Sequence, residues 1–68
     1  MLDIGKALDQ AMRERDLSNV QVAAAIGSAE ITIKHWRQSK KEPRGRAIIA
    51  LVKFIPRFGE LLGLRVIT

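Results

Sequence analysis

The segment of residues 17–37 constrains the fold most, because its pattern predicts two short helices separated at Gly27. Ser18 and Gln21 have the spacing of a capping box, in which two side chains satisfy each other's backbone N–H groups at a helix start. Apolar residues then recur at helical spacing. Gly27 follows the last of them, where helices often end in a left-handed turn. We therefore expect a second helix to start directly after this turn.

The second of these helices, expected at about residues 29–38, has two different faces. Ile33 and Trp36 lie three positions apart and are expected to point inward. Trp36 is the largest apolar residue, so a place in the core is strongly favoured over an exposed base-stacking role. The opposite face carries mainly polar side chains, which are Glu30, Ile31, Lys34, His35 and Gln38.

Length and composition limit the possible functions. With 68 residues, 47% of them hydrophobic, the chain is expected to form one domain (residues 1–68) with one small core. It has no cysteine and one histidine, so neither a disulfide framework nor a metal site is expected. No secretory signal stands out, and the longest apolar run is far below the roughly 20 residues that span a bilayer. We expect a cytoplasmic protein with no cofactor, small-molecule ligand or membrane partner.

Helical periodicity also predicts a helix before this segment. Asp3 can cap this first helix, which runs to about Arg15. Leu17 is expected to pack inward at the start of the next helix. The apolar face of the first helix consists of Ile4, Leu8, Ala11 and Met12.

A fourth helix is expected after a polar connector at residues 39–42. Pro43 fits the first turn of this helix, where its missing N–H group is not needed. Between residues 47 and 55 the only charged residue is Lys53. A helix with this composition is expected to be buried nearly all round.

The end of the chain predicts one more short helix. Pro56 ends or kinks the fourth helix, and Gly63 is expected to end a fifth. Residues 64–68 are apolar and β-branched enough for an extended tail. The predicted fold class is therefore an all-α domain of four to five helices.

Five residues have a spacing that goes beyond a generic helix pair, namely Ala23, Gly27, Ile33, Trp36 and Pro43. Over residues 17–43 the chain resembles the lambda-repressor-like family of DNA-binding domains, which includes the phage Cro proteins and the Xre-type regulators. In that family a small residue precedes the turn glycine by four positions and lets the two helices cross closely. The resemblance implies a helix-turn-helix domain, built from the second and third helices, that binds double-stranded DNA.

Two places depart from the family's pattern. Ser28 and Ala29 replace an apolar residue and a polar cap, so Ser28 is an alternative cap that would start the recognition helix one residue earlier. Arg37 stands where many members have a glutamate, and Met12 replaces the basic partner of that glutamate. Both halves of the pair are absent together, which leaves Asp9 and a DNA phosphate as alternative partners for Arg37.

Four residues are expected to contact bases. By resemblance, Glu30 and Ile31 fall on the first two base-reading positions, and Lys34 and His35 fall on the next turn. In the major groove a glutamate can accept from cytosine, an isoleucine can pack on a thymine methyl group, and lysine or histidine can donate to guanine. Ile31 leaves two alternatives open, contact with a base or packing back onto the first helix.

Basic side chains are concentrated beside the expected recognition helix. Six of the twelve basic residues lie within residues 34–46, and only Glu42 opposes them. Alone, this strip would be explained better as a solvated surface, but beside the helix-turn-helix spacing a polyanion-binding surface is favoured. The helix start after Ser18 can also attract phosphate. The expected phosphate contacts are Ser18, Asn19, Thr32, Gln38, Lys40, Lys41 and Arg44.

The last third of the chain predicts a protein interface. From residue 47 to residue 67, fourteen of twenty-one residues are hydrophobic, more than one small monomer is expected to bury. We hypothesise a homodimer formed through about residues 44–68; the alternative is that these side chains all pack within one chain. The expected interface residues are Phe54, Ile55, Phe58, Leu62, Leu64 and Val66.

The favoured function is a sequence-specific transcriptional regulator, a phage- or plasmid-type, Cro-like repressor. It would bind a two-fold operator as a dimer, with the recognition helix at residues 29–38 in the major groove. The alternative is a protein-interaction module on the same fold, such as an antitoxin or antirepressor, for which DNA binding would be secondary. An enzyme is not expected, since no paired carboxylates, nucleophile–base pair or phosphate-binding loop stands out.

Overall fold

The computed structural model describes residues 3–63, which contain five helices and no strand. The prediction of an all-α fold with four to five helices is confirmed in this range. The expected tail at residues 64–68, with Leu64 and Val66, lies outside the described residues. The helices are α1 (Ile4–Glu14), α2 (Asn19–Ile26), α3 (Glu30–Arg37), α4 (Gly45–Phe54) and α5 (Pro56–Leu61).

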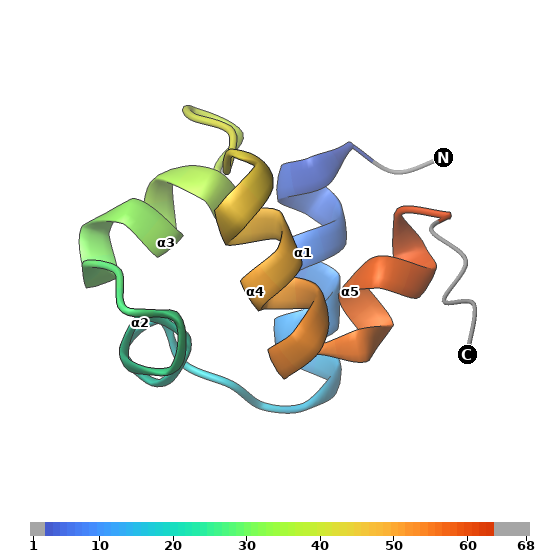
Figure 1. Cartoon of the computed structure of the whole chain (residues 1–68), viewed down its shortest axis with the longest axis horizontal. Helices are drawn as coiled ribbons and strands as arrows, with labels where there is room; N and C mark the ends of the chain where they lie inside the picture. Colours follow the sequence, from blue (N-terminus) through green and yellow to red (C-terminus); the bar gives the residue numbers. More distant parts are fainter. Residues whose placement is uncertain (1–2, 64–68) are drawn as a thin grey trace.

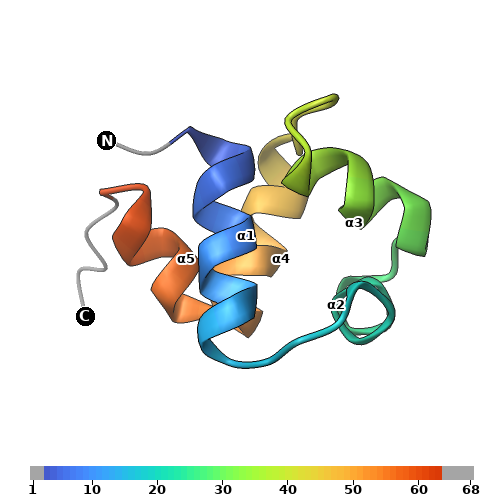
Figure 2. The same cartoon turned by 180° about the vertical axis from the view of Figure 1, so that it is seen from behind.

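The helices are short, from 6 to 11 residues, and pack into a compact body of 31 × 23 × 21 Å. Figures 1 and 2 show α1 in the middle, with α2 and α3 on one side and α5 on the other. Within residues 3–63, no helix is both long and apolar enough to cross a bilayer.

The start of α1 follows from local hydrogen bonding. Asp3 is the N-cap, and its Oδ1 atom accepts a hydrogen bond from the backbone N–H of Lys6 at 3.1 Å. After the helix ends, Asp16 adopts a left-handed φ of 53°, which aspartate tolerates better than most residues. The predicted apolar face of α1 is confirmed, because its members all pack in or against the core: Ile4, Leu8, Ala11 and Met12.

The predicted capping box and turn between α2 and α3 are confirmed. The backbone N–H of Gln21 donates to Ser18 Oγ at 3.1 Å, and the backbone N–H of Ser18 donates to Gln21 Oε1 at 2.8 Å. Gly27 ends α2 with a φ of 74°. A Cβ atom on this glycine would meet nothing within 4 Å, so the backbone conformation, and not lack of space, favours glycine here.

The alternative in which Ser28 caps the recognition helix is wrong. The N-cap of α3 is Ala29, which makes no side-chain capping bond. Ser28 instead completes the end of α2, where its backbone N–H donates to the Ala23 carbonyl at 2.9 Å. The helix therefore starts at Glu30, one residue later than the sequence predicted.

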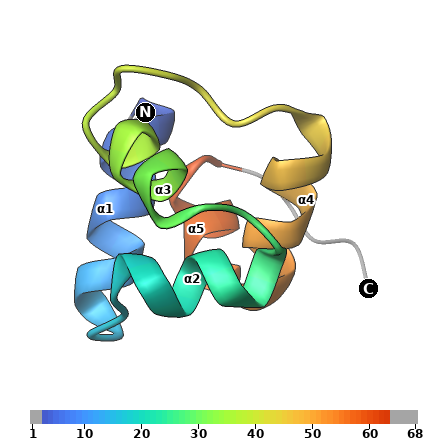
Figure 3. The ribbon, with the colours of Figure 1, turned by 90° about the vertical axis from the view of Figure 1, so that its left-hand side faces the viewer.

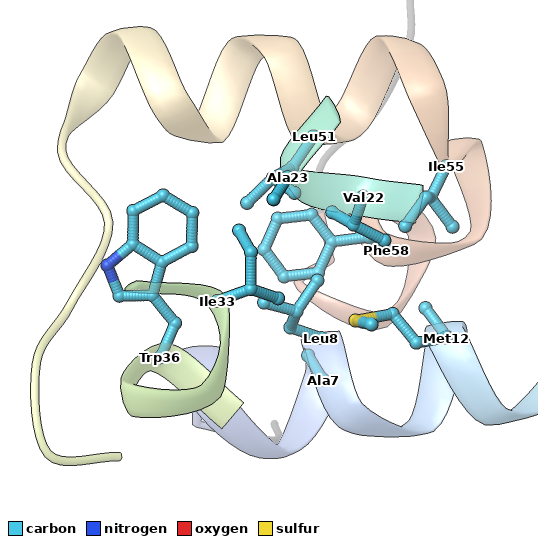
Figure 4. Packing of buried hydrophobic residues seen from close by; sticks show 11 residues of the cluster. Ala7, Leu8, Met12, Val22, Ala23, Ile33, Trp36, Leu51, Ile55 and Phe58 are labelled. Carbon is cyan, nitrogen blue, oxygen red and sulfur yellow. The ribbon is translucent and has the colours of Figure 1, made fainter. Parts of the chain in front are cut away.

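The core collects one or more side chains from every helix. Figure 4 shows Trp36 at one edge of the cluster, beside Ile33, while Phe58 lies at its centre. Only 7% of Trp36 is exposed, which confirms its expected place in the core. Leu17 packs against the same cluster, as predicted. The fully or nearly buried apolar residues are Ala7, Leu8, Ala11, Met12, Val22, Ala23, Ile33, Trp36, Leu51, Ile55 and Phe58.

Two predictions about the fourth helix are wrong. Pro43 is buried in the connection and precedes the helix, since α4 starts at Gly45 with Arg44 as its N-cap. The helix is also not buried all round. Leu51 is its only fully buried residue, and Ile49 is 58% exposed, because α4 packs on α2 and α5 through one face alone.

The fifth helix forms as predicted. Pro56 occupies its first turn, and Gly63 follows its C-cap with a left-handed φ of 77°. The helix packs on α1 and α4. An ion pair of 3.0 Å between Arg57 Nε and Glu14 Oε1 connects α5 to the end of α1.

The structure corrects the predicted dimer interface. Ile55 and Phe58 are fully buried inside one chain, because Ile55 precedes α5 and Phe58 lies on it, and this helix packs on α1 and α4. Neither side chain is available to a second copy. Phe54 is 38% exposed and Leu62 is half-buried, so these two retain accessible surface.

We predict that Trp36→Ala lowers the free energy of unfolding by about 3–5 kcal/mol, because it removes buried apolar surface and leaves a cavity. For so small a domain this is most of the expected stability. Thermal unfolding followed by circular dichroism measures it. Ile31→Ala is the control and should change the stability by less than about 0.5 kcal/mol. A sharp transition of Trp36→Ala near the wild-type temperature would contradict the core assignment.

A second prediction concerns Gly5, which is buried where α1 passes close to the end of α3. A Cβ atom here would overlap the Trp36 carbonyl oxygen and the Ser39 hydroxyl. Gly5→Ala should therefore destabilise the protein by about 1–3 kcal/mol despite its better helix propensity. Gly45→Ala is the control, since a Cβ atom there meets nothing within 4 Å. It should stabilise by about 0.4–1 kcal/mol in the same denaturant titration. Equal effects of the two substitutions would refute the close approach.

Candidate nucleic-acid interface

The outward face of α3 is free of contacts that would bury it. Ile33 and Trp36 attach the helix to the core, while Glu30, Ile31 and Lys34 are exposed. Ile31 is 54% exposed, so the alternative in which it packs back onto the first helix is wrong. A large apolar side chain is thus exposed on the same helix as an exposed carboxylate and an exposed ammonium group.

His35 is placed differently from the other three expected base-contact residues. Its side chain is half-buried. Its carbonyl oxygen accepts a hydrogen bond from the backbone N–H of Lys40 at 3.0 Å, which turns the chain out of α3. His35 therefore contributes to the end of the helix, and the exposed members of this set are Glu30, Ile31 and Lys34.

The connection from α3 to α4 is held against α1. Ser39 adopts a left-handed φ of 59°, and its hydroxyl donates to Asp3 Oδ1 at 3.2 Å. The backbone N–H of Lys6 does most to hold the pKa of Asp3 below its ordinary value, and the Ser39 hydroxyl lowers the pKa further. This contact ties down the segment that carries the exposed side chains of Lys40 and Lys41.

Basic residues near α3 mostly lack acidic partners. In the described part of the chain, the basic side chains in ion pairs are Arg13, Arg37 and Arg57. Of the six basic residues within residues 34–46, only Arg37 is paired. Figure 3 shows α2 and α3 facing the viewer, with the connection to α4 crossing above them. The unpaired members are Lys34, Lys40, Lys41, Arg44 and Arg46, and all five are exposed.

The remaining expected phosphate contacts differ in exposure. Gln38 is exposed and Thr32 is half-buried, both on or next to α3. Ser18 is exposed at the start of α2, although its Oγ atom already accepts from Gln21. Asn19 is half-buried, and its Oδ1 atom accepts a hydrogen bond from Arg37 Nη1 at 2.7 Å.

Arg37 joins three helices, and the sequence did not predict this completely. Of its two alternative partners, Asp9 is the one in the structure, with 2.8 Å between Arg37 Nε and Asp9 Oδ1. The second partner, Asn19, was not predicted, because nothing in the spacing of α2 and α3 indicates which side chains meet where they cross. Arg13 Nε binds the other carboxylate oxygen of Asp9 at 2.7 Å.

The carboxylate of Asp9 stays ionised in this network. Partial burial opposes ionisation, but the hydrogen bonds and charges of Arg37 and Arg13 outweigh it. Together they hold the pKa of Asp9 below its ordinary value of 3.8. Beside the network lies an open hollow of about 420 Å³, lined by Asp9, Arg13, Asn19, Lys34, Arg37 and Gln38.

Among residues 3–63, no group of three or more His, Cys, Asp or Glu side chains is arranged to hold an ion. The arrangement offers hydrogen-bond donors and positive charge, together with one exposed apolar side chain.

Comparison with models of known families found no match, and comparisons with curated proteins and with solved structures found none either. The structure therefore defines the class of this protein only broadly. Over residues 3–63 it is a small, compact all-helical domain of five helices.

We predict that Asp9→Asn destabilises the protein by about 1 kcal/mol near neutral pH, allowing for the partial exposure of the ion pairs. Because the folded-state pKa of Asp9 lies below 3.8, its contribution is present above that pH and is lost as the pH falls through the folded value. The difference from wild type should therefore shrink below pH 3.8 in denaturant titrations. Asp16→Asn, with no ion pair in residues 3–63, is the control and should follow the wild type. A pH-independent difference for Asp9→Asn would contradict this assignment.

Proposed function

We propose that this protein is a sequence-specific transcriptional regulator that binds double-stranded DNA through a lambda-repressor-like helix-turn-helix, α2 and α3. The observation that carries the proposal is the exposed Ile31 between Glu30 and Lys34 on a helix anchored from its other face. A protein gains little from an isoleucine in water unless a partner covers it. The thymine methyl group in the major groove is such a partner.

In this mechanism α3 enters the major groove with its N-terminal end first. Glu30 accepts a hydrogen bond from a cytosine amino group, and Ile31 packs on a thymine methyl group. Lys34, one turn later, donates to guanine or to a phosphate. His35 is half-buried, so it has a smaller share in base contact than the other three.

Phosphate contacts fix the orientation of the helix without reading sequence. The exposed Lys40, Lys41 and Arg44 lie after α3, and Ser18 and Asn19 lie at the start of α2. In the sequence, these positions lie before and after α3. If a dimer makes about six phosphate contacts, its affinity should fall by roughly a thousandfold between 50 and 200 mM salt.

Pairing of two chains is part of the proposal, because a helix of this length reads only one half-site. In the C-terminal part of the chain that the structure describes, Ile49, Phe54 and Leu62 have accessible apolar surface for this pairing. A dimer would bind a two-fold operator with half-sites about one helical turn apart. With this arrangement the protein would act by occupying a promoter, as a repressor does.

A second candidate function is a protein-interaction module on the same fold, such as an antitoxin or antirepressor. The observation in its favour is that Val20 on α2 and Ile49 on α4 are also exposed apolar side chains. In that case the apolar side chains would engage another protein. Selection of binding sites from random duplexes separates the two candidates, since only a DNA reader enriches a defined, two-fold symmetric sequence.

We predict that Lys34→Ala and Lys40→Ala each weaken DNA binding. Where the substituted lysine contacts a phosphate, the slope of log affinity against log salt should also fall in magnitude by about 1. Lys53→Ala is the control, because Lys53 is exposed and unpaired in residues 3–63 but lies at the far end of α4. Fluorescence anisotropy with a selected duplex over a salt series measures both quantities. Unchanged affinity in Lys34→Ala and Lys40→Ala would exclude the proposed DNA-binding surface.

A further inference from the structure

The hollow between α1, α2 and α3 has an excess of positive charge. Arg13, Lys34 and Arg37 contribute three positive charges to its lining, and Asp9 contributes one negative charge, which leaves a net charge of +2. Both oxygens of Asp9 are occupied by guanidinium groups, Oδ1 by Arg37 and Oδ2 by Arg13. The single carboxylate is therefore already neutralised, and it would repel an incoming anion only weakly.

All three nitrogens of the Arg37 guanidinium group are already engaged within the protein. Its Nε and Nη2 atoms contact Asp9 Oδ1, and its Nη1 atom donates to Asn19 Oδ1. A guanidinium group only donates hydrogen bonds, so the Asn19 atom that faces it must be the carbonyl oxygen. This contact fixes the orientation of the Asn19 amide and turns its NH₂ group away from Arg37.

Several donors around the hollow are unused. Within residues 3–63 the Asn19 NH₂ group, the Lys34 ammonium group and the Gln38 side chain make no hydrogen bond. Arg13 is 75% exposed and binds Asp9 through Nε alone, which leaves its terminal nitrogens free. Each of these four side chains has unused N–H donors, and two of the four are charged; Gln38 also has an unused acceptor oxygen. Such a set fits an anion with several acceptor oxygens.

We propose that this hollow binds one phosphodiester group of the DNA backbone, and that Arg37 is a positioning residue that presents the Asn19 amide to it. The proposal rests on the DNA-binding function above and assigns one contact within it. Asn19, Lys34 and Arg13 donate to the phosphate oxygens, while Arg37 holds the amide in place from behind. Because a phosphate carries no sequence information, the contact strengthens binding to every duplex equally.

Asn19→Asp tests phosphate binding in the hollow with little change in the shape of the side chain. An aspartate still accepts from Arg37, and a carboxylate in the first turn of a helix is favourable, so the fold should be retained. The substitution replaces the NH₂ donor with an anionic oxygen that repels phosphate. We expect affinity for a labelled random-sequence duplex at low salt to fall about ten- to a hundredfold.

Gln21→Glu is the matched control. It makes the same amide-to-carboxylate change in the same turn of α2, and glutamate retains the capping box with Ser18. Gln21 does not line the hollow. Its added charge acts through screened solvent, so we expect only a few-fold loss of affinity.

A double-mutant cycle tests the positioning role of Arg37. Arg37→Lys keeps the positive charge beside Asp9 but lacks the planar group that contacts Asp9 and Asn19 together, so it should weaken binding several-fold in the wild-type background and have little further effect when Asn19 is alanine. A purely structural role for Arg37 would instead reduce affinity by the same factor in both backgrounds. Circular dichroism confirms that all variants are folded at the temperature of the binding measurement.

The outcomes are distinct. The proposed phosphate site in the hollow is supported by a large loss of affinity for Asn19→Asp, a small loss for Gln21→Glu and a non-additive cycle. Equal losses for the two carboxylate variants, or an additive cycle, overturn it. If the wild type binds DNA and Asn19→Asp binds equally well, phosphate binding in the hollow is excluded while the proposed function stands. If the wild type binds no duplex at all, both are overturned.

Discussion

Burial of Ile33 and Trp36 is the interaction on which the rest of this structure depends. These two side chains attach α3 to the core, and only because they point inward do the residues between and around them point outward. An isolated helix of eight residues is marginal in water, so α3 owes its stability to this packing. The exposed positions of Glu30, Ile31 and Lys34 are thus a consequence of the core.

A polar network supports the same arrangement from the outer edge. Arg37 lies at the end of α3, Asp9 on α1 and Asn19 at the start of α2, so their hydrogen bonds join the three helices. Apolar packing is non-directional and tolerates small rotations, whereas these bonds require particular atoms at particular distances. The network therefore adds directional constraints on how the three helices cross, which packing alone would not supply.

The C-terminal part of the chain shows how local composition can mislead. A run of nine residues with one charge was expected to be buried nearly all round, yet Ile49 is largely exposed and Phe54 is partly exposed. Burial of a helix requires neighbours on every side, and this short chain supplies them only for one face of α4. Ile55 and Phe58 had been expected at an interface between chains. They are instead buried within one chain, because Pro56 starts α5, which packs on α1 and α4.

Local patterns determined the helices themselves. The features that set the helices act within a few residues of the chain, so the sequence predicts them. They are the capping groups Asp3 and Ser18, the turn at Gly27 and the inward pair Ile33 and Trp36. The same applies to the outward face of α3, since helical periodicity specifies which residues oppose the inward pair. Only the assembled helices decided that Arg37 meets Asn19, that Gly5 lies against Trp36 and Ser39, and that six side chains surround one hollow. These residues are far apart in sequence, and no local rule gives the angles at which helices cross, because those angles depend on the packing of the whole core.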